Sequence, residues 1–285
     1  MTEAIWIAAG NNADLCAAIF RAHGLRFERD DRLLRCLDAP PPFYPGIVTL
    51  HPDVDPDEIL GLAGRGAVAI KDSFATLDPT PLGCVVLSEA CWIECDPCAG
   101  AMPEGWGRVE DPAAFSAWRR TWRGDAGPDA DCVFPDPCLE APDLAFLARW
   151  EGARMRAGCL ANLSEAVVGL SNVFGLGQDP SGFAQALHAA GSFGGARTVV
   201  GYENGDRLTA ARAAGFREIG CLRILVPKDG RGKKVRKPPR PSDVHSRGPV
   251  YTGGRQVTRP GPRQSQLPRN CLRPPEFRHM GREGQ

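Results

Sequence analysis

The chain has 285 residues with no net charge, a length that suits one large domain or two smaller ones with enough apolar residues for a core. No stretch approaches the roughly 20 apolar residues that a membrane span needs, and the apolar run Ala4 to Ala9 is too short for a signal peptide. The 11 cysteines are irregularly spaced, which argues against a disulfide framework. We therefore expect a cytoplasmic protein with no membrane partner.

Residues 1–95 have the pattern of a mixed α/β region. Asn12 suits the N-cap of a helix over 14–23 that ends before Gly24. Alternation in 25–37 predicts paired strands, and the proline-rich segment after them predicts a rigid connection. A strand, a short helix and two more strands are then expected, at 47–51, 55–64, 67–77 and 84–94.

A second run of elements begins near Trp106. A strand is followed by a helix over 111–124, with Pro112 at an allowed first position and an apolar face that indicates core packing. Three strands are expected within 144–175, and the run then closes with a helix, a strand, a helix and a strand. This order predicts a mixed α/β fold whose central sheet is mostly antiparallel and flanked by helices.

Two segments far apart in the chain are loosely alike. PLGCVVLSEACWI, at 81–93, echoes AGFREIGCLRILV, at 214–226. This echo suggests that the N-terminal region is a degenerate copy of the unit that follows it. The expected organisation is an N-terminal α/β region at 1–95, a second domain at 96–227 and a tail at 228–285.

The tail differs in composition from the rest of the chain. It holds 15 Lys and Arg against 4 Asp and Glu, with 9 Pro and 8 Gly, whereas the preceding residues hold 19 basic and 30 acidic side chains. Such a segment cannot bury enough apolar surface to fold, so disorder is expected. Its charge would attract nucleic acid, but it has only two aromatic residues and no recognisable fold, so we favour a non-functional extension over a nucleic-acid partner.

The stretch 198–226 is the most informative part of the sequence. It predicts a strand, a helix that begins after Asn204, and a strand that follows Gly215-Phe216. This resembles the N-x-x-A-x-x-x-Y-x-x-x-G-F ending of acyl-CoA N-acyltransferases of the GNAT superfamily. Two positions depart from that pattern: Arg207 replaces the alanine, and Ala211 replaces the tyrosine that typically protonates the leaving thiolate.

The loop over 174–184 lies where that superfamily places a phosphate-binding turn between a strand and a helix. Gln178, Gly182 and Ala184 resemble its Q/R-x-x-G-x-G/A motif with one extra residue. Backbone amides at a helix N-terminus suit a pyrophosphate, although Asp179 adds an opposing charge. Pro180 stands at the third glycine of a dinucleotide fingerprint, which excludes that alternative.

The resemblance covers about 106–227 and implies a function and a site. It implies a divergent GNAT-fold N-acyltransferase that moves an acetyl or other acyl group from acetyl-CoA or another acyl-CoA to an amine of a small molecule or protein. Glu203 is the candidate base, Tyr202 the candidate proton donor, and Asn204 the third catalytic candidate. The candidate cofactor-binding residues are Ser171, Asn172, Val173, Phe174, Gln178, Ser181, Gly182, Phe183 and Ala184.

Other functions remain open at this point. A catalytically inactive protein with the same fold that binds CoA or another ligand is the main alternative, because Ala211 lacks an acidic proton. Tail-mediated association with nucleic acid is the next alternative.

Three further patterns point to other sites. Cys91, Cys95 and Cys98 have the C-x3-C-x2-C spacing of a cluster site, and Cys132 or Cys138 could complete a zinc site, but the predicted strand around Cys91 leads us to expect no metal. The sequence has no G-x-S-x-G motif for a hydrolase. Polar residues beside strands also suggest a substrate pocket, namely Tyr44, Lys71 and Asp72.

Overall fold

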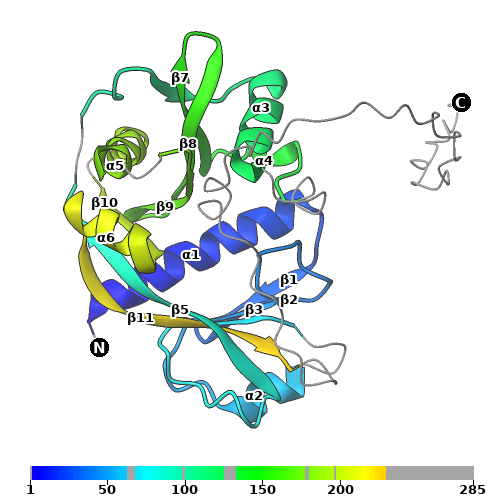
Figure 1. Ribbon diagram of the computed structural model, residues 1–285. Coiled ribbons are helices and arrows are strands. Elements are labelled where there is room, and N and C mark those ends of the chain that lie inside the picture. The colour runs from blue at the N-terminus through cyan, green and yellow to red at the C-terminus, as the bar shows by residue number, and fades with distance from the viewer. Residues whose placement is uncertain are drawn as a thin grey trace, which may run out of the picture. The chain divides into compact units, whose positions relative to one another are not determined.

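The computed structural model describes residues 2–62, 68–97, 100–124, 133–176, 180–195 and 197–228 (Figure 1). The tail for which disorder is predicted lies outside the described residues from position 229 onward. None of the described helices is long and apolar enough to cross a bilayer.

The described strands form one 11-stranded sheet of order β1-β2-β3-β4-β11-β5-β10-β9-β8-β7-β6. The first five strands along the chain are β1 (Phe27–Arg29), β2 (Leu33–Cys36), β3 (Ile47–Thr49), β4 (Ile70–Asp72) and β5 (Cys84–Cys95). The other six are β6 (Trp106–Arg108), β7 (Leu144–Glu151), β8 (Arg154–Leu163), β9 (Val167–Phe174), β10 (Thr198–Glu203) and β11 (Arg217–Pro227). Most neighbouring pairs are antiparallel, which confirms the predicted fold class.

Helices cover both faces of this sheet. The helices are α1 (Glu3–Ala22), α2 (Pro56–Leu62), α3 (Pro112–Arg123), α4 (Pro137–Glu140), α5 (Pro180–Gly194) and α6 (Gly205–Ala213). α1, α3 and α4 share an apolar cluster on one face, and α5 and α6 pack against the opposite face of the C-terminal strands. α1 also packs on β2 and β3, so this one helix runs along strands from both parts of the chain (Figure 1).

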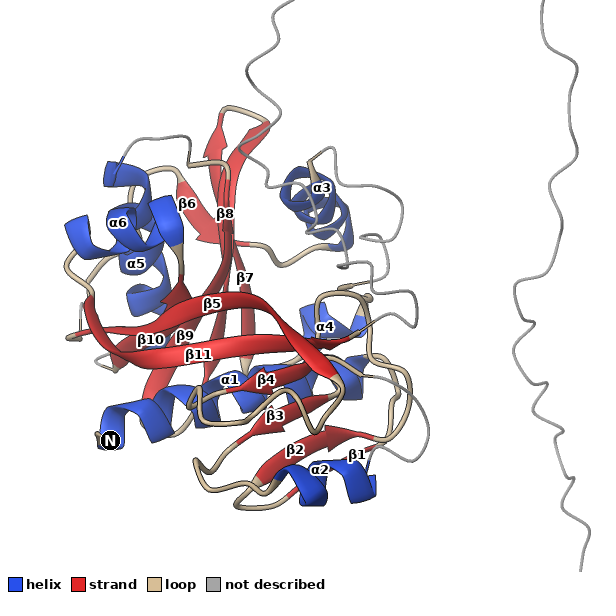
Figure 2. Cartoon of the chain, turned by 60° about the horizontal axis from the view of Figure 1, so that its bottom comes forward, coloured by secondary structure: helices blue, strands red, loops and turns tan. Residues whose placement is uncertain are grey.

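The sheet repeats its pairing pattern on either side of β5 and β11, which run side by side through its middle (Figure 2). β4 pairs antiparallel with β11, as β10 does with β5. β3 is parallel to β4, as β9 is to β10, and antiparallel strands follow on both sides. When 81–93 is aligned with 214–226, Glu89 corresponds to Leu222 and Ala90 to Arg223. The pairing of β5 with β11 obeys the same correspondence, because Leu222 pairs with Ala90 and Arg223 pairs with Glu89. This internal symmetry supports the hypothesis of two degenerate copies.

The two proposed copies, an N-terminal copy at 1–95 and a C-terminal copy at 96–227, share their central strands. β5, from the first copy, lies between β11 and β10 of the second, and β11 lies between β4 and β5. Residues 1–95 and 96–227 therefore contribute to one continuous sheet, and the boundary at residue 95 stays a prediction.

The first helix differs from its prediction. It begins at Glu3, and Asn12 lies within it as a buried residue instead of capping it. Ala8, Ala9 and Ala13 form a small-residue face that packs on the sheet. This tertiary burial outweighs the local cap preference of asparagine, so the predicted start was wrong.

The helix over 112–123 follows its prediction. The Asp111 carboxylate caps it by accepting a hydrogen bond from the backbone N–H of Ala114, and Pro112 occupies the first turn. Phe115 and Trp118 are fully buried, and the Trp118 indole donates to the Leu147 carbonyl at 3.0 Å. The apolar face is core, as expected.

Candidate functional site

The parallel strands β9 and β10 separate partway along their length. Their pairing runs from Thr198↔Val167 to Val200↔Gly169, with no further pair between the described residues of these strands. At the next position the backbones are still close, since a Cβ on Gly201 would lie 2.7 Å from the Leu170 carbonyl oxygen. Gly201 therefore marks the point at which the strands diverge.

A β-bulge accompanies this divergence. The register of β8 and β9 shifts between Leu160↔Ser171 and Gly158↔Phe174, so two residues of β9 oppose one of β8. One of the two, Asn172, has a φ of 52°, in the left-handed region. The bulge lies in β9 just beyond its last pair with β10, so the irregular stretch of β9 borders the gap.

The predicted cofactor-binding residues of β9 have different environments. Ser171 lines a cavity beside the gap, and Asn172 Nδ2 donates to its hydroxyl at 3.1 Å. Val173 and Phe174 are buried in apolar clusters. Any contact of these two residues with a ligand would therefore come from the backbone.

Helix α5 begins shortly after β9, as the sequence predicts. Ser181 is exposed in its first turn, Ala184 is half-buried, and Gly182 is buried, where a Cβ would lie 2.9 Å from Leu176 Cβ. Phe183 packs edge-on against Phe216 with ring centroids 5.8 Å apart, so its side chain belongs to the core. Gln178 lies outside the described residues.

The predicted catalytic residues at the end of β10 face different ways. Tyr202 packs with the apolar cluster under α1, whereas Glu203 pairs with Arg207 of α6 at 3.8 Å. Burial raises the pKa of the Glu203 carboxyl to about 7, and the nearby Arg207 guanidinium only partly offsets this shift. Asn204 Nδ2 donates to the Ser88 hydroxyl at 3.1 Å and the Glu89 carbonyl at 3.2 Å, which ties the start of α6 to β5.

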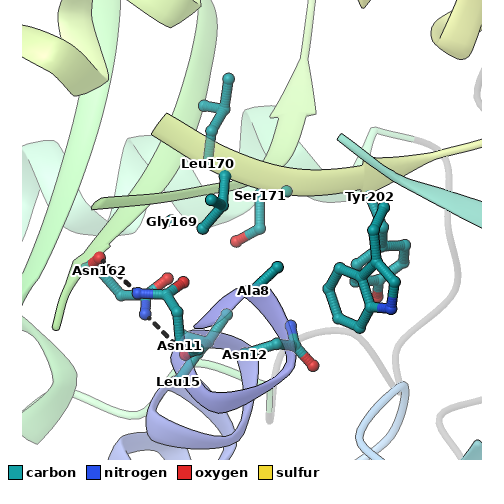
Figure 3. A pocket seen from close by; sticks show the side chains of 12 residues that line it. Ala8, Asn11, Asn12, Leu15, Asn162, Gly169, Leu170, Ser171 and Tyr202 are labelled. Carbon is teal, nitrogen blue, oxygen red and sulfur yellow. Dashed lines mark hydrogen bonds between the residues drawn. The ribbon is translucent and has the colours of Figure 1, made fainter. Parts of the chain in front are cut away.

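A small polar cavity lies where the strands part, beneath α1 (Figure 3). Its free volume is ≈ 10 Å³, about enough for one water molecule. Its polar wall comes from α1, β8, β9 and β10, namely from Asn11, Asn12, Asn162, Ser171 and Tyr202.

Two asparagines at one end of this cavity fix each other. Asn11 Nδ2 donates to the Asn162 carbonyl at 3.3 Å and to the Ser164 hydroxyl at 2.8 Å, and Asn162 Nδ2 donates to the Asn11 carbonyl at 3.0 Å. A Cβ on Gly169 would lie 2.2 Å from the side-chain oxygens of both asparagines. With their amide nitrogens engaged, both Oδ1 atoms converge on Gly169, at the last paired position of β9.

A buried lysine lies behind Asn12 and Tyr202, which line the other end of the cavity. Lys71, on β4, is 3% exposed; its Nζ donates to Asn12 Oδ1 at 2.6 Å and to the Tyr202 hydroxyl oxygen at 3.2 Å. The Nζ atom also lies 4.3 Å from the centroid of the Tyr202 ring. Lys71 was predicted only from its place beside a strand, and its link to Tyr202 joins the two copies.

The other predicted pocket residues have structural partners. Asp72 is fully buried, and its carboxylate accepts a hydrogen bond from Arg223 of β11 at 2.7 Å. Burial raises the pKa of the Tyr44 hydroxyl well above its usual value. Asn11 and Asn162 were missed by the sequence analysis, because nothing in the local pattern distinguishes them from cap or turn residues.

The cysteine array does not form a metal site within the described residues. Cys91 and Cys95 are half-buried on β5, Cys138 is buried in α4, and the part of the chain that the structure describes has no cluster of three metal-ligating side chains. Cys98 and Cys132 lie outside the described residues.

No protein-family model and no curated protein matches the sequence. Among solved structures, the chain is similar to a GCN5-related N-acetyltransferase from Kribbella flavida, with 18% identity, 77% of this chain and 96% of that chain covered, and a TM-score of 0.53. It is also similar to a GNAT-family protein from Novosphingobium aromaticivorans, with 14% identity, 79% and 97% coverage, and a TM-score of 0.51.

These similarities span almost the whole length of both solved chains. Because the identities are low, they show a shared fold and nothing about activity. They confirm that the chain has the divergent GNAT fold expected from its C-terminal signature.

Proposed function

We propose that this protein transfers an acyl group from acetyl-CoA or another acyl-CoA to an amine. The observation that carries the proposal is the separation of β9 and β10 after Val200↔Gly169 within a GNAT fold. Bound there, an acyl-CoA would supply an activated thioester. Its pantetheine arm would lie along the backbone of β9 around Ser171 and Asn172, and the first turn of α5 suits its phosphates.

The reaction requires one proton acceptor and one proton donor. The amine nitrogen attacks the thioester carbonyl carbon, the C–N bond forms as the C–S bond breaks, the amine loses a proton and the thiolate gains one. Tyr202 on the α1 side and Glu203 on the α6 side flank the strand ends from opposite faces. Each residue can therefore serve one of the two proton transfers.

The position of Ala211 favours an assignment opposite to the one predicted from the sequence. Ala211 replaces the usual donor to the thiolate, is fully buried, and belongs to α6, one turn after the Arg207 that pairs with Glu203. With a pKa of about 7, Glu203 is substantially protonated at neutral pH. We assign Glu203 as the donor to the thiolate, and Tyr202 as the group that relays the amine proton toward solvent.

The pH dependence of turnover tests these roles. As a donor, Glu203 must be protonated, so kcat should fall as pH rises through about 7. As the base predicted from the sequence, it would make kcat rise through the same range. Glu203→Gln should lower kcat by about 10²-fold in either role and should remove the titration; an unchanged profile would exclude both roles.

A catalytically inactive CoA-binding protein is the second candidate, favoured by the buried alanine at position 211. Calorimetric titration of acetyl-CoA into the full chain tests the shared premise of both. Micromolar binding together with release of free CoA in the presence of an amine supports the enzyme, and binding without turnover of a broad amine panel supports the second candidate. No binding up to millimolar concentrations would overturn both.

A further inference from the structure

Two cysteines face each other across β5 and β11, the strands in the middle of the sheet (Figure 2). Cys91 is the direct partner of Cys221 in this antiparallel pairing. Directly paired residues project from the same face, with Cβ atoms about 4.5–5.5 Å apart. The next pair along the strands, Ala90 and Leu222, lies in the apolar cluster under α1. Cys91 and Cys221 therefore project from the opposite face of the sheet, on the side of α6.

The two thiols differ in their surroundings. Both are free and they interact with each other, but Cys221 is exposed to solvent whereas Cys91 is half-buried. Burial, a hydrogen bond to the Glu218 carboxylate and the neighbouring Cys221 together raise the pKa of the Cys91 thiol to about 11. Cys91 therefore stays protonated at neutral pH, and Cys221 is the thiol that a reagent in solution meets first.

The spacing of the two residues suits a disulfide. Paired Cα atoms of antiparallel strands lie about 4.5–5.5 Å apart, which is within the range that disulfides span, and the Cβ atoms need to approach by about 1 Å. The register of β11 against β5 shifts between Glu218 and Gly220, directly before Cys221, and such a bulge lets the strand bend locally. Within the described strands, no other cysteine has a cysteine as its direct partner.

We infer that Cys91 and Cys221 are a reversible redox pair, which a small-molecule disulfide such as oxidised glutathione converts to a disulfide bond between β5 and β11. The Cys221 thiolate attacks one sulfur of the small disulfide, which forms a mixed disulfide and releases one thiolate. The Cys91 sulfur then attacks the Cys221 sulfur, the protein disulfide forms and the second small thiolate leaves. The two released thiolates take up the protons that the cysteines lose, so two protein thiols are oxidised as one small disulfide is reduced.

The bond would join the two copies covalently. β5 belongs to the N-terminal copy and β11 to the C-terminal copy, so the disulfide closes the long loop from residue 91 to residue 221. Closing a long loop restricts the unfolded chain and so stabilises the folded one. Cys91 is also the direct partner of Glu203 on β10, which places the bond beside the proposed proton donor. Its formation does not depend on the proposed acyl transfer and needs no activity assay.

Mapping of the thiols in the full chain tests the pair. The reduced protein is incubated with excess oxidised glutathione, alkylated, and digested without reductant. We expect a disulfide-linked pair of peptides that contain Cys91 and Cys221, which dithiothreitol separates again. Absence of these linked peptides, or a stable glutathione adduct on Cys221 in their place, would overturn the inference.

Matched variants separate the two steps of the reaction. Cys91→Ser lacks the second thiol, so the glutathione adduct on Cys221 should accumulate about tenfold above its level in the unsubstituted protein, where the adjacent thiol displaces it. Cys95→Ser removes another half-buried cysteine of β5 and should leave the linked peptides unchanged. Equal adduct levels with and without Cys91 would contradict its role as the displacing thiol.

Thermal unfolding measures whether the bond locks the two copies together. Oxidation should raise the unfolding midpoint of the full chain by about 5 °C or more, and both Cys91→Ser and Cys221→Ser should lack this rise. A mapped bond between the two cysteines without a higher midpoint would overturn the locking of the copies.

Discussion

The two copies within this sheet share a strand pattern but differ in how completely they are built. The C-terminal copy has long strands, a bulge at Asn172 and two helices, α5 and α6, on one face. In the described part of the N-terminal copy, a single short helix, α2, takes the place of α5, and a loop takes the place of α6. The features that suit an acyl donor are thus confined to the C-terminal copy.

One pair of equivalent positions illustrates the difference. Phe216, just before β11, packs against Phe183 in the C-terminal core. Gly83 holds the matching place before β5, and there the N-terminal copy has a cavity of ≈ 200 Å³ lined by Ile59, Leu82 and neighbouring apolar side chains. Among the described residues, the N-terminal copy has one helix fewer on this face and a smaller apolar cluster. It contributes α1, β5 and Lys71 to the surroundings of the cavity at the strand opening.

The strongest test of this division concerns the ion pair that joins β4 to β11. Arg223→Met leaves the fully buried Asp72 carboxylate without its cation, and we expect a loss of about 3–5 kcal/mol in unfolding free energy. Arg217→Met, on the same strand, removes the pairs of an exposed guanidinium with Glu94 and Asp96 and should cost far less, because solvent screens such pairs. Urea unfolding of the full chain measures both, and equal losses would mean that the copies are not joined through Asp72.

The unequal cores give the next largest effect. Phe216→Ala should cost about 3 kcal/mol, because it opens a cavity in a packed cluster. Leu82 borders a cavity that is already open, so Leu82→Ala should lower the unfolding free energy by only about 1 kcal/mol. A larger loss for Leu82→Ala in the same unfolding experiment would show that the N-terminal core is the tighter one.

Two glycines make the comparison at the level of the backbone. Gly201→Ala would place a Cβ 2.7 Å from the Leu170 carbonyl oxygen, so we expect a loss of about 2 kcal/mol and weaker acetyl-CoA binding. Gly61, exposed in α2, has open space around it, and Gly61→Ala should stabilise the protein by up to about 1 kcal/mol through helix propensity. Unchanged stability and binding in Gly201→Ala would remove the reason for a glycine at the strand opening.

The smallest effect concerns Glu203 and depends on pH. Its folded-state pKa of about 7 exceeds the ordinary 4.5, so ionisation destabilises the fold progressively as pH rises from about 4.5 through 7. Glu203→Gln removes this cost, and its advantage in unfolding free energy should grow from near zero at pH 4.5 to about 1–2 kcal/mol at pH 8. A constant difference across this range would show that the carboxyl is not perturbed by burial.

The sequence predicts the C-terminal copy well because its signals are local. The glycine before Phe216 and the helix after Asn204 are sufficient to indicate a strand-helix-strand ending, and the apolar periodicity of 112–123 predicts its buried face. The sequence could not show that β5 lies between β11 and β10 and that β11 lies between β4 and β5. Strand partners far apart in the chain leave no local pattern.

The same limit applies to the candidate site. Tyr202 and Glu203 were identified from a neighbouring motif, but their opposite faces depend on helices that pack from either side. Asn11 and Asn162 are 151 residues apart and meet because α1 packs against β8 and β9. Asn12 was taken for a cap, since its true partner, Lys71, lies on a strand 59 residues away.

The position of β11 between β4 and β5 also governs how the protein emerges from the ribosome. An ordinary tandem protein completes its first domain while the second is being translated. Here β4 and β5 lack their shared neighbour until the last strand of the sheet has been synthesised. Nearly the whole folded region must therefore be translated before either copy closes, and the apolar face of β5 has to be kept from aggregation in the meantime.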